Sequence, residues 1–509
     1  MSLLRPSLRL ILGIFAAITS LTAPSPAAEE PPNKPTITVR AVRPDREVEA
    51  VIHLFRGSRA ANPAAALTAW KRASVEPKRL GKVVDAVIAL LNPRMLREYQ
   101  VLDGAEVAIS FIPGSTRWDW RARFPHDDGT LGVVGPTADL SGGRIEPAIG
   151  EYRVDRFPGN TLVLLARGPA GLFAAGSREQ LEAALAVASV PATTPPVDSG
   201  WLIQIDPTAR DTWTSLTGQR WAAAAQTTGC QGVSGQVQFL PTTLVATLTG
   251  QFAGNTPIVP SIDSAWLDPI PTRGPLAAFS LRVDPSAGAW SRVFDLLDRV
   301  ERIDPERAQV ASSRIRLALA ARAVGVRLEA DVWPHLQGVS GWVGVAAGRL
   351  DRAVLVIHLD DPAAARRVLD GVKGNRRPDG PDEVVDAGSI AGQPLRLIRR
   401  QATVFLAWGD RAWPESRAAV DDPARSARPW LIRSRTGALP SRVGAVWLDQ
   451  LPRVPPGTPL AASLLDAPPI RWAGTNDGNR TIDEFWADGL DATVRRFLDR
   501  LPLDPAPEP

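Results

Sequence analysis

The stretch Val354-Leu355-Val356-Ile357-His358-Leu359-Asp360-Asp361-Pro362-Ala363 joins an apolar strand to an Ala-rich helix. An Asp side chain accepts a backbone N–H at the start of a helix, and Pro fits the first helical position, where no donor is needed. The same phrase, with Asp or Asn before the Pro, recurs at 51–66, 202–208 and 279–286. These repeated joints of strand and helix predict a repeated α+β module.

The spacing of the repeats is uneven, so the pattern predicts tandem duplicated domains rather than a solenoid. Strand-like runs come in adjacent pairs, which favours largely antiparallel sheets with helices packed on one face. The expected domains are a first α+β module at 48–190, a linker at 191–200, a partial α+β module with a Pro-rich connection at 201–275, a second full α+β module at 276–420, and a C-terminal partial module with a frayed tail at 421–509.

Local patterns predict the main elements of both modules. In the first module we expect a strand at 50–55, after an extended leader at 28–47, and a helix at 177–187 that Ser177 caps. Gly-Val-Ser-Gly runs at 232–235 and 338–341 are interpreted as turns that open hairpins. In the rest of the chain we expect a strand at 277–283, a helix at 285–300, strands at 341–347 and 351–359, a helix at 362–372, a polar acidic loop at 374–388 and a helix at 482–500.

The N-terminus has the pattern of a signal peptide at 1–27. Arg5 and Arg9 precede the apolar run from Leu10 to Leu21, and Ser25-Pro26-Ala27 supplies small residues for cleavage. We expect cleavage near Ala27, with an uncleaved anchor as the alternative. Removal of 1–27 would lower the formal charge from +4 by two, to +2, because Arg5 and Arg9 are lost with no acidic residue. The expected location is therefore exported, either periplasmic or extracellular.

The composition fits a folded protein that buries a core. The chain has 509 residues, enough for roughly two to four domains, with 44% apolar and 22% charged residues. The single cysteine, Cys230, excludes an intramolecular disulfide. Arginine pairs are scattered among acidic residues, so nothing indicates nucleic-acid binding, and no segment beyond the N-terminus reaches transmembrane length without charges.

No catalytic motif stands out. Of the four histidines, His53 and His358 fall inside apolar runs interpreted as strands, which favours structural roles. No His-Glu-x-x-His or phosphate-binding loop occurs, so no metal or cofactor is expected. Ser234 and Ser340 sit in the Gly-Val-Ser-Gly runs and lack the context of a nucleophile. Asn476-Asp477-Gly478 resembles part of a calcium loop but is better interpreted as a turn.

Tryptophan is unusually common, at 16 residues against two tyrosines. Trp118 and Trp120 flank Asp119 in an expected hairpin, where alternation puts both rings on one face. Such a face could stack on a sugar or a peptide, so Trp118 and Trp120 are speculative ligand-binding residues. Packing in cores and between domains is the preferred interpretation of most tryptophans.

The pattern over about 50–420 resembles uncharacterised exported bacterial proteins of the domain-of-unknown-function class. These proteins carry tandem α+β units with a capped helix and a Leu-x-Gly-x-x-Gly sequence, here Leu336-Gln337-Gly338-Val339-Ser340-Gly341. The resemblance implies no activity and no site residues. The expected function is a non-catalytic envelope or periplasmic protein that binds or scaffolds, its partner an envelope protein or glycan. The alternative is a secreted glycan or peptide hydrolase whose site assembles only in the fold.

Overall fold

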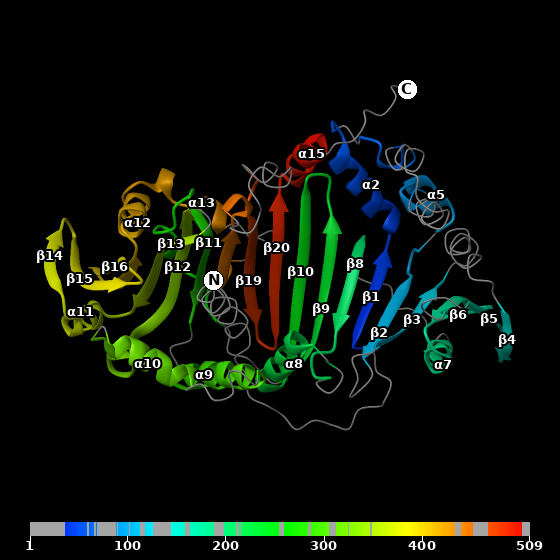
Figure 1. Ribbon diagram of the computed structural model, residues 1–509, viewed down its shortest axis with the longest axis horizontal. Helices are drawn as coiled ribbons and strands as arrows, with labels where there is room; N and C mark the ends of the chain where they lie inside the picture. The colour runs from blue at the N-terminus through cyan, green and yellow to red at the C-terminus, as the bar shows by residue number, and fades with distance from the viewer. Residues whose placement is uncertain are drawn as a thin grey trace. The chain divides into compact units, whose positions relative to one another are not determined.

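The computed structural model describes most of the chain beyond its N-terminal segment (Figure 1). The chain divides into two compact units, each made of separate stretches of sequence. Within the described residues, the N-terminal unit lies in 26–219, 232–248 and 488–509, and the C-terminal unit lies in 220–231 and 249–487. The structure describes residues 36–58, 61–65, 68, 88, 90–100, 102–111, 118–125, 144–157, 163–187, 198–209, 213, 215–253, 259–283, 287–304, 312–323, 325–346, 349–432, 439–450 and 467–500.

The N-terminal unit is a sheet with helices. Its strands pair in the order β4-β5-β6-β7-β3-β2-β1-β8-β9-β10, and the pairs with a known register are antiparallel. The elements are β1 (Ile37–Val42), α2 (Pro44–Phe55), α5 (Pro93–Glu98), β2 (Glu106–Phe111), β3 (Trp118–Phe124), β4 (Arg144–Ile149), β5 (Tyr152–Phe157), β6 (Val163–Gly168), β7 (Gly171–Ala175), α7 (Arg178–Val187), β8 (Gly200–Ile205), most of β9 (Cys230–Phe239), part of β10 (Thr243–Phe252) and α15 (Leu490–Arg500).

The strands of the C-terminal unit also pair antiparallel, in the order β14-β15-β16-β17-β13-β12-β11-β18-β19-β20. Most of α8 (Leu216–Thr228) belongs to this unit. The strands are β11 (Pro275–Arg282), β12 (Leu336–Ala346), β13 (Arg349–Leu359), β14 (Asn375–Asp379), β15 (Asp382–Ile390), β16 (Gln393–Arg400), β17 (Thr403–Trp408), β18 (Arg442–Val446), β19 (Ile470–Asp477) and β20 (Arg480–Asp488). The helices are η2 (Ser264–Leu267), α9 (Ala287–Arg302), α10 (Ser313–Ala323), η3 (Leu328–Val332), η4 (Trp333–His335), α11 (Pro362–Gly371), α12 (Ala412–Asp421), η5 (Pro423–Arg425), α13 (Arg428–Leu431) and η6 (Leu448–Gln450).

Helices cover both faces of the C-terminal sheet, whereas the sequence predicted helices on one face. Side chains alternate along β13. Val354 and Val356 pack in one cluster with Trp413 of α12, and Leu359 packs in another with Leu369 of α11. The two hydrophobic cores of this unit therefore lie on opposite sides of the same strands.

Several joints form as the sequence predicts. The Asp361 side chain accepts hydrogen bonds from the Ala363 and Ala364 amides at the start of α11, at 2.8 and 3.2 Å. Ser177 caps α7 by accepting from the Gln180 amide at 3.3 Å. The β19–β20 hairpin turns at Gly478, with a φ of +56°, and Asn479, whereas Asn476 and Asp477 of the expected turn are the last residues of β19.

Other predictions of local structure are wrong. Residues 51–55 belong to helix α2 rather than a strand, and the expected extended leader contains β1. After Asp206 the chain makes a turn, and the next named helix is α8. The expected loop at 374–388 is the β14–β15 hairpin, and much of the expected helix at 482–500 is β20, since α15 begins at Leu490.

The Gly-Val-Ser-Gly runs lie inside strands β9 and β12, so their interpretation as turns is also wrong. Gly338 and Gly341 are needed for space. A Cβ atom at Gly338 would lie 2.2 Å from the Trp266 ring, and one at Gly341 would lie 2.5 Å from the Val354 carbonyl oxygen. The contacts that select glycine come from residues distant in the sequence.

Candidate functional site

Helix α2 places a row of polar side chains along one face. Pro44 stands in its first turn with Asp45 and Glu47, which suits the positive end of a helix. Arg46, Glu49, His53 and Arg56 follow at intervals of three or four residues, so they share a face. Sequence reasoning missed this row because it placed His53 in a strand.

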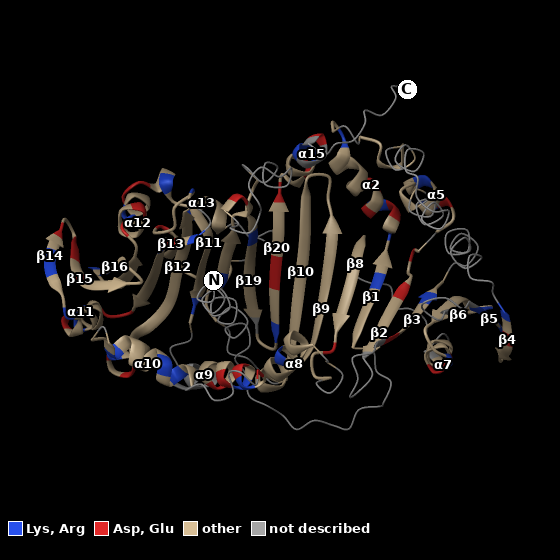
Figure 2. Ribbon diagram, viewed as in Figure 1, with Lys and Arg blue, Asp and Glu red and all other residues tan. Residues whose placement is uncertain are grey.

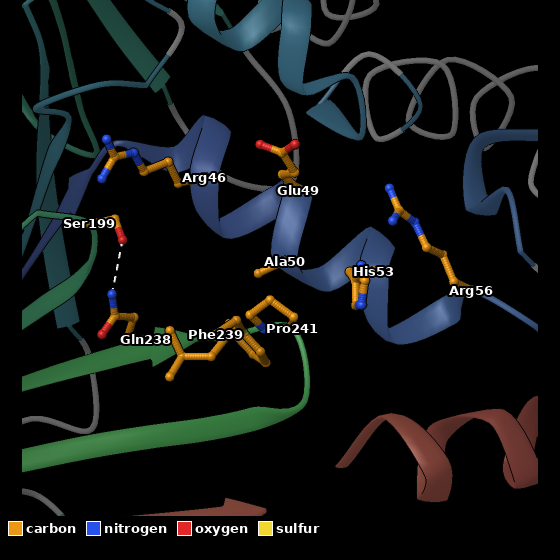
Figure 3. Close-up of a pocket in the computed structure, with 10 residues that line it drawn as sticks. Arg46, Glu49, Ala50, His53, Arg56, Ser199, Gln238, Phe239 and Pro241 are labelled. Carbon is orange, nitrogen blue, oxygen red and sulfur yellow. Dashed lines mark hydrogen bonds between the residues drawn. The ribbon is translucent and has the colours of Figure 1, made fainter. Parts of the chain in front are cut away.

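A groove of about 390 Å³ runs beside this face (Figure 3). This volume is within the range of small-molecule sites. Figure 3 shows Arg46 and Arg56 toward the two ends of the row, with Glu49 directed away from Phe239. Besides the row, the groove is lined by Ala50 and Ser199 and by Gln238, Phe239, Leu240 and Pro241 where β9 ends.

Partly buried hydrogen bonds hold the wall of the groove in place. The Phe239 amide donates to Glu47 Oε2 at 2.7 Å, although Glu47 itself is only 3% exposed. Gln238 donates to the Ser199 hydroxyl at 3.1 Å, and Gln236 donates to the Ser199 carbonyl at 2.9 Å. The end of β9 is therefore fixed to α2 and to the start of β8 without using the row of side chains that faces the groove.

Burial raises the pKa of Glu47 above its ordinary value, while the Phe239 amide and the nearby Ser199 side chain act in the opposite direction. The folded state thus favours the protonated acid. Its contribution to stability is fully present below the unfolded pKa, near 4.5, and is lost as the pH rises through the folded pKa.

We therefore expect Glu47→Gln to become more stable relative to wild type as the pH rises above about 4.5. The amide still accepts from Phe239 but carries no buried charge. Chemical denaturation at a series of pH values measures the difference, with Glu49→Gln on the exposed side of α2 as the matched control. A constant difference between Glu47→Gln and wild type at every pH would contradict the assignment.

Some of the charged side chains around α2 form ion pairs and others do not. Arg97 reaches both Glu49, at 3.4 Å, and Asp45, at 3.0 Å, and Arg43 also pairs with Asp45. Burial alone would raise the pKa of Asp45, but the two arginines lower it below its ordinary value. Arg46 and Arg56 are exposed and form no ion pair with any other described residue. The groove therefore presents net positive charge over an apolar wall.

A second cluster in the C-terminal unit brings Ser340 and His358 together. Ser340 Oγ lies 2.8 Å from His358 Nε2, and both residues are buried. Trp266 stacks on the imidazole with 4.5 Å between ring centroids, and Arg282 lies 5.0 Å from the Trp266 centroid. Burial, assisted by the positive charge of Arg282, lowers the pKa of His358 to about 3, so the ring is neutral at physiological pH.

This pair has part of the arrangement of a serine nucleophile with its base. A catalytic dyad needs a reachable hydroxyl, and the base is usually oriented by a third group. Ser340 is fully buried, and among described residues the His358 imidazole has no hydrogen-bond partner other than Ser340. The arrangement fits packing beneath Trp266 better than attack on a substrate.

The other residues singled out in the sequence are dispersed. Trp120 is partly buried against a cluster that contains Ala122 and Leu172, while the side chain of Trp118, like all of His126, falls outside the described residues. Ser234 lies in β9 opposite Gln204. Cys230 is buried and is not part of a disulfide.

The described residues contain neither a metal-binding cluster nor a membrane-spanning helix. No group of three or more His, Cys, Asp or Glu side chains in this part of the chain could hold a metal ion. Within the same residues, no helix combines the length and apolar character needed to cross a bilayer. Comparison with known proteins found no match among protein-family models, curated proteins or solved structures.

Proposed function

We propose that this chain is an exported, non-catalytic binding or scaffolding protein of the cell envelope or periplasm, and that the groove beside α2 is its binding site. The observation that supports this proposal most directly is the groove, which combines an apolar wall with Arg46 and Arg56, neither of which forms an ion pair with another described residue. The export pattern at 1–27 falls outside the described residues, so this part of the proposal rests on the sequence.

We also propose that the chain contains two copies of one module, β1–β10 and β11–β20. Adding ten to each strand number of the N-terminal order gives the C-terminal order. The β4–β5 and β14–β15 hairpins both turn at a glycine with positive φ, Gly150 at +56° and Gly380 at +66°. Helices of ten residues, α7 and α12, follow β7 and β17. An experimental structure in which the two sets of strands fail to superpose would refute this duplication.

The geometry of the groove favours an extended acidic segment of an envelope protein as its ligand. Arg46 lies in the first turn of α2 and Arg56 is the C-cap residue ten positions later, which separates their backbone positions by about 15 Å. An extended chain advances about 3.3 Å per residue, so acidic residues four or five positions apart would match this spacing. Side chains between them would meet Phe239, Leu240 and Pro241.

The test is binding of fluorescent peptides that carry two acidic residues at varied spacing, measured by anisotropy with the whole mature chain. We expect a preference for a spacing of about four or five residues, and a loss of at least about tenfold in affinity for Arg46→Glu/Arg56→Glu. Arg144→Glu, an exposed arginine of β4 that does not line the groove, is the matched control.

Equal peptide binding by wild type and the double variant would refute the groove as the binding site. If the protein bound acidic glycans but no acidic peptide, the glycan would replace the peptide as the proposed ligand. The competing proposal, a secreted hydrolase, would have to use the buried Ser340–His358 pair. Treating the same protein with a fluorophosphonate probe separates the two, because labelling of Ser340 would support the hydrolase and refute a non-catalytic role.

A further inference from the structure

Helix α10 exposes apolar residues that its own unit does not use. Ile315 and Leu319 are 52% and 59% exposed, and Arg322 is also exposed. These three residues fall at i, i+4 and i+7, so they form one outward row along the helix. Leu317, farther around the helix, is 41% exposed.

Contacts on the inner side of α10 attach this helix to the rest of its unit. The Ser313 amide donates to Asp298 of α9 at 2.6 Å, and Arg316 pairs with Glu301 of the same helix. Ala321 packs against the core cluster that contains Leu281 and Leu369. Because these contacts lie on the inner side, the outward row is not needed to hold the helix in place.

The charge around the outward row is mostly positive. No acidic residue occurs from Arg307 to Leu328, a stretch that contains five arginines. Figure 1 shows α9 and α10 following one another, and Figure 2 shows basic residues along both, alternating with acidic residues on α9. Arg299 and Arg302 near the end of α9 are exposed and, like Arg322, form no ion pair with another described residue. The nearby acids include Asp298 and Glu301, which contact α10 itself, as well as Asp295 and Glu329.

We infer that the α9–α10 surface, defined by Arg299, Arg302, Ile315, Leu319 and Arg322, docks on a bilayer that contains anionic phospholipid. Apolar side chains beside arginines on one face of a helix are the pattern of an interfacial helix, in which the apolar groups enter the headgroup boundary while the cations remain at the phosphates. This surface is separate from the α2 groove, so the inference goes beyond the proposed function and does not rest on it.

Charge also disfavours a second copy of the chain as the occupant. In a two-fold dimer the same patch meets itself, so Arg299, Arg302 and Arg322 would face the arginines of the partner copy. An anionic membrane instead supplies the opposite charge to all three and solvates the apolar row. The attraction should weaken with added salt, as expected for exposed charges.

The experiment is cosedimentation of the mature protein with phosphatidylcholine vesicles prepared with and without phosphatidylglycerol. We expect binding only to the anionic vesicles, and about tenfold weaker binding for Ile315→Ser/Leu319→Ser and for Arg299→Glu/Arg322→Glu. Ile390→Ser, which changes an apolar residue of β15 that is 53% exposed, is the matched control. Circular dichroism checks that each variant retains the fold.

A second readout reports whether the outward row of α10 enters the bilayer. An environment-sensitive dye on Leu319→Cys should shift to the blue with anionic vesicles, whereas the same dye on Ile390→Cys should not. Equal binding to neutral vesicles, unchanged binding by both double variants, or a concentration-dependent dimer abolished by Ile315→Ser/Leu319→Ser would overturn the inference. If the wild-type protein bound anionic vesicles but no acidic peptide, the result would count against the α2 groove as a binding site and not against membrane docking.

Discussion

Replacing Trp342 with alanine should destabilise the C-terminal unit by about 3–5 kcal/mol. Among the described residues, Trp342 is the largest fully buried side chain, and it packs in the cluster that includes Val354 and Trp413. Its indole N–H also donates to the Ser416 hydroxyl at 2.8 Å, and that hydroxyl donates to the Pro269 carbonyl at 3.0 Å. The substitution therefore leaves a cavity and removes a donor from a buried hydrogen-bond chain.

Chemical denaturation followed by circular dichroism measures this loss. Trp342→Phe keeps most of the apolar contact and should cost less, while Trp221→Ala removes a tryptophan of α8 that is 43% exposed and should change stability by no more than about 0.5 kcal/mol. If Trp342→Ala and Trp221→Ala lowered the free energy of unfolding equally, this buried cluster would not be what stabilises the unit.

The parts of the fold that were predicted correctly depend on local chemistry. The joint between β13 and α11 needs only Asp361 to accept two amides and Pro362 to start the helix, and both residues are adjacent in the sequence. The Gly478 turn between β19 and β20 likewise depends on its own backbone. Such signals remain legible without knowing the tertiary structure.

The misassigned helix α2 shows where local reasoning fails. Residues 51–55 form a short apolar run, and such runs do not distinguish a strand from a buried helix. Counting from Pro44 gives a helical face that contains Glu47, Ala50 and Leu54, but Glu47 is acidic, and the buried Asp45 lies on the other side of the helix. Asp45 and Glu47 can be buried because Arg43 and Arg97 pair with Asp45 and the Phe239 amide donates to Glu47. Two buried acidic residues interrupt the apolar periodicity, so the sequence did not indicate a helix.

The candidate sites were missed for two different reasons. The polar row from Arg46 to Arg56 was legible in principle, because its spacing becomes a single face once the segment is a helix. The contact between Ser340 and His358 was not, because it depends on the register of β12 against β13, in which His358 lies opposite Gly338. Gly338 in turn leaves room for Trp266, whose position is fixed by tertiary packing.

The buried histidine leads to the second large effect, a loss of stability in acid. The pKa of His358 is lowered from 6.5 to about 3 in the folded state. Between these values the unfolded chain binds more protons, so the stabilisation is present above pH 6.5 and is lost as the pH falls toward 3. The slope is about 1.4 kcal/mol per pH unit for one such group.

His358→Gln isolates this effect from the protonation of carboxylates, which also destabilises proteins in acid. The amide can bond to Ser340 and fit beneath Trp266, but it does not titrate. We expect the free energy of unfolding of wild type to fall more steeply than that of His358→Gln from pH 6.5 downward, with His335→Gln, which removes a less buried histidine that contacts Asp360, as the matched control. Parallel curves for wild type and His358→Gln would mean that the imidazole takes up its proton without unfolding, which requires solvent to reach it past Trp266. That result would also reopen Ser340 and His358 as a working pair, because the case against them rests on their burial.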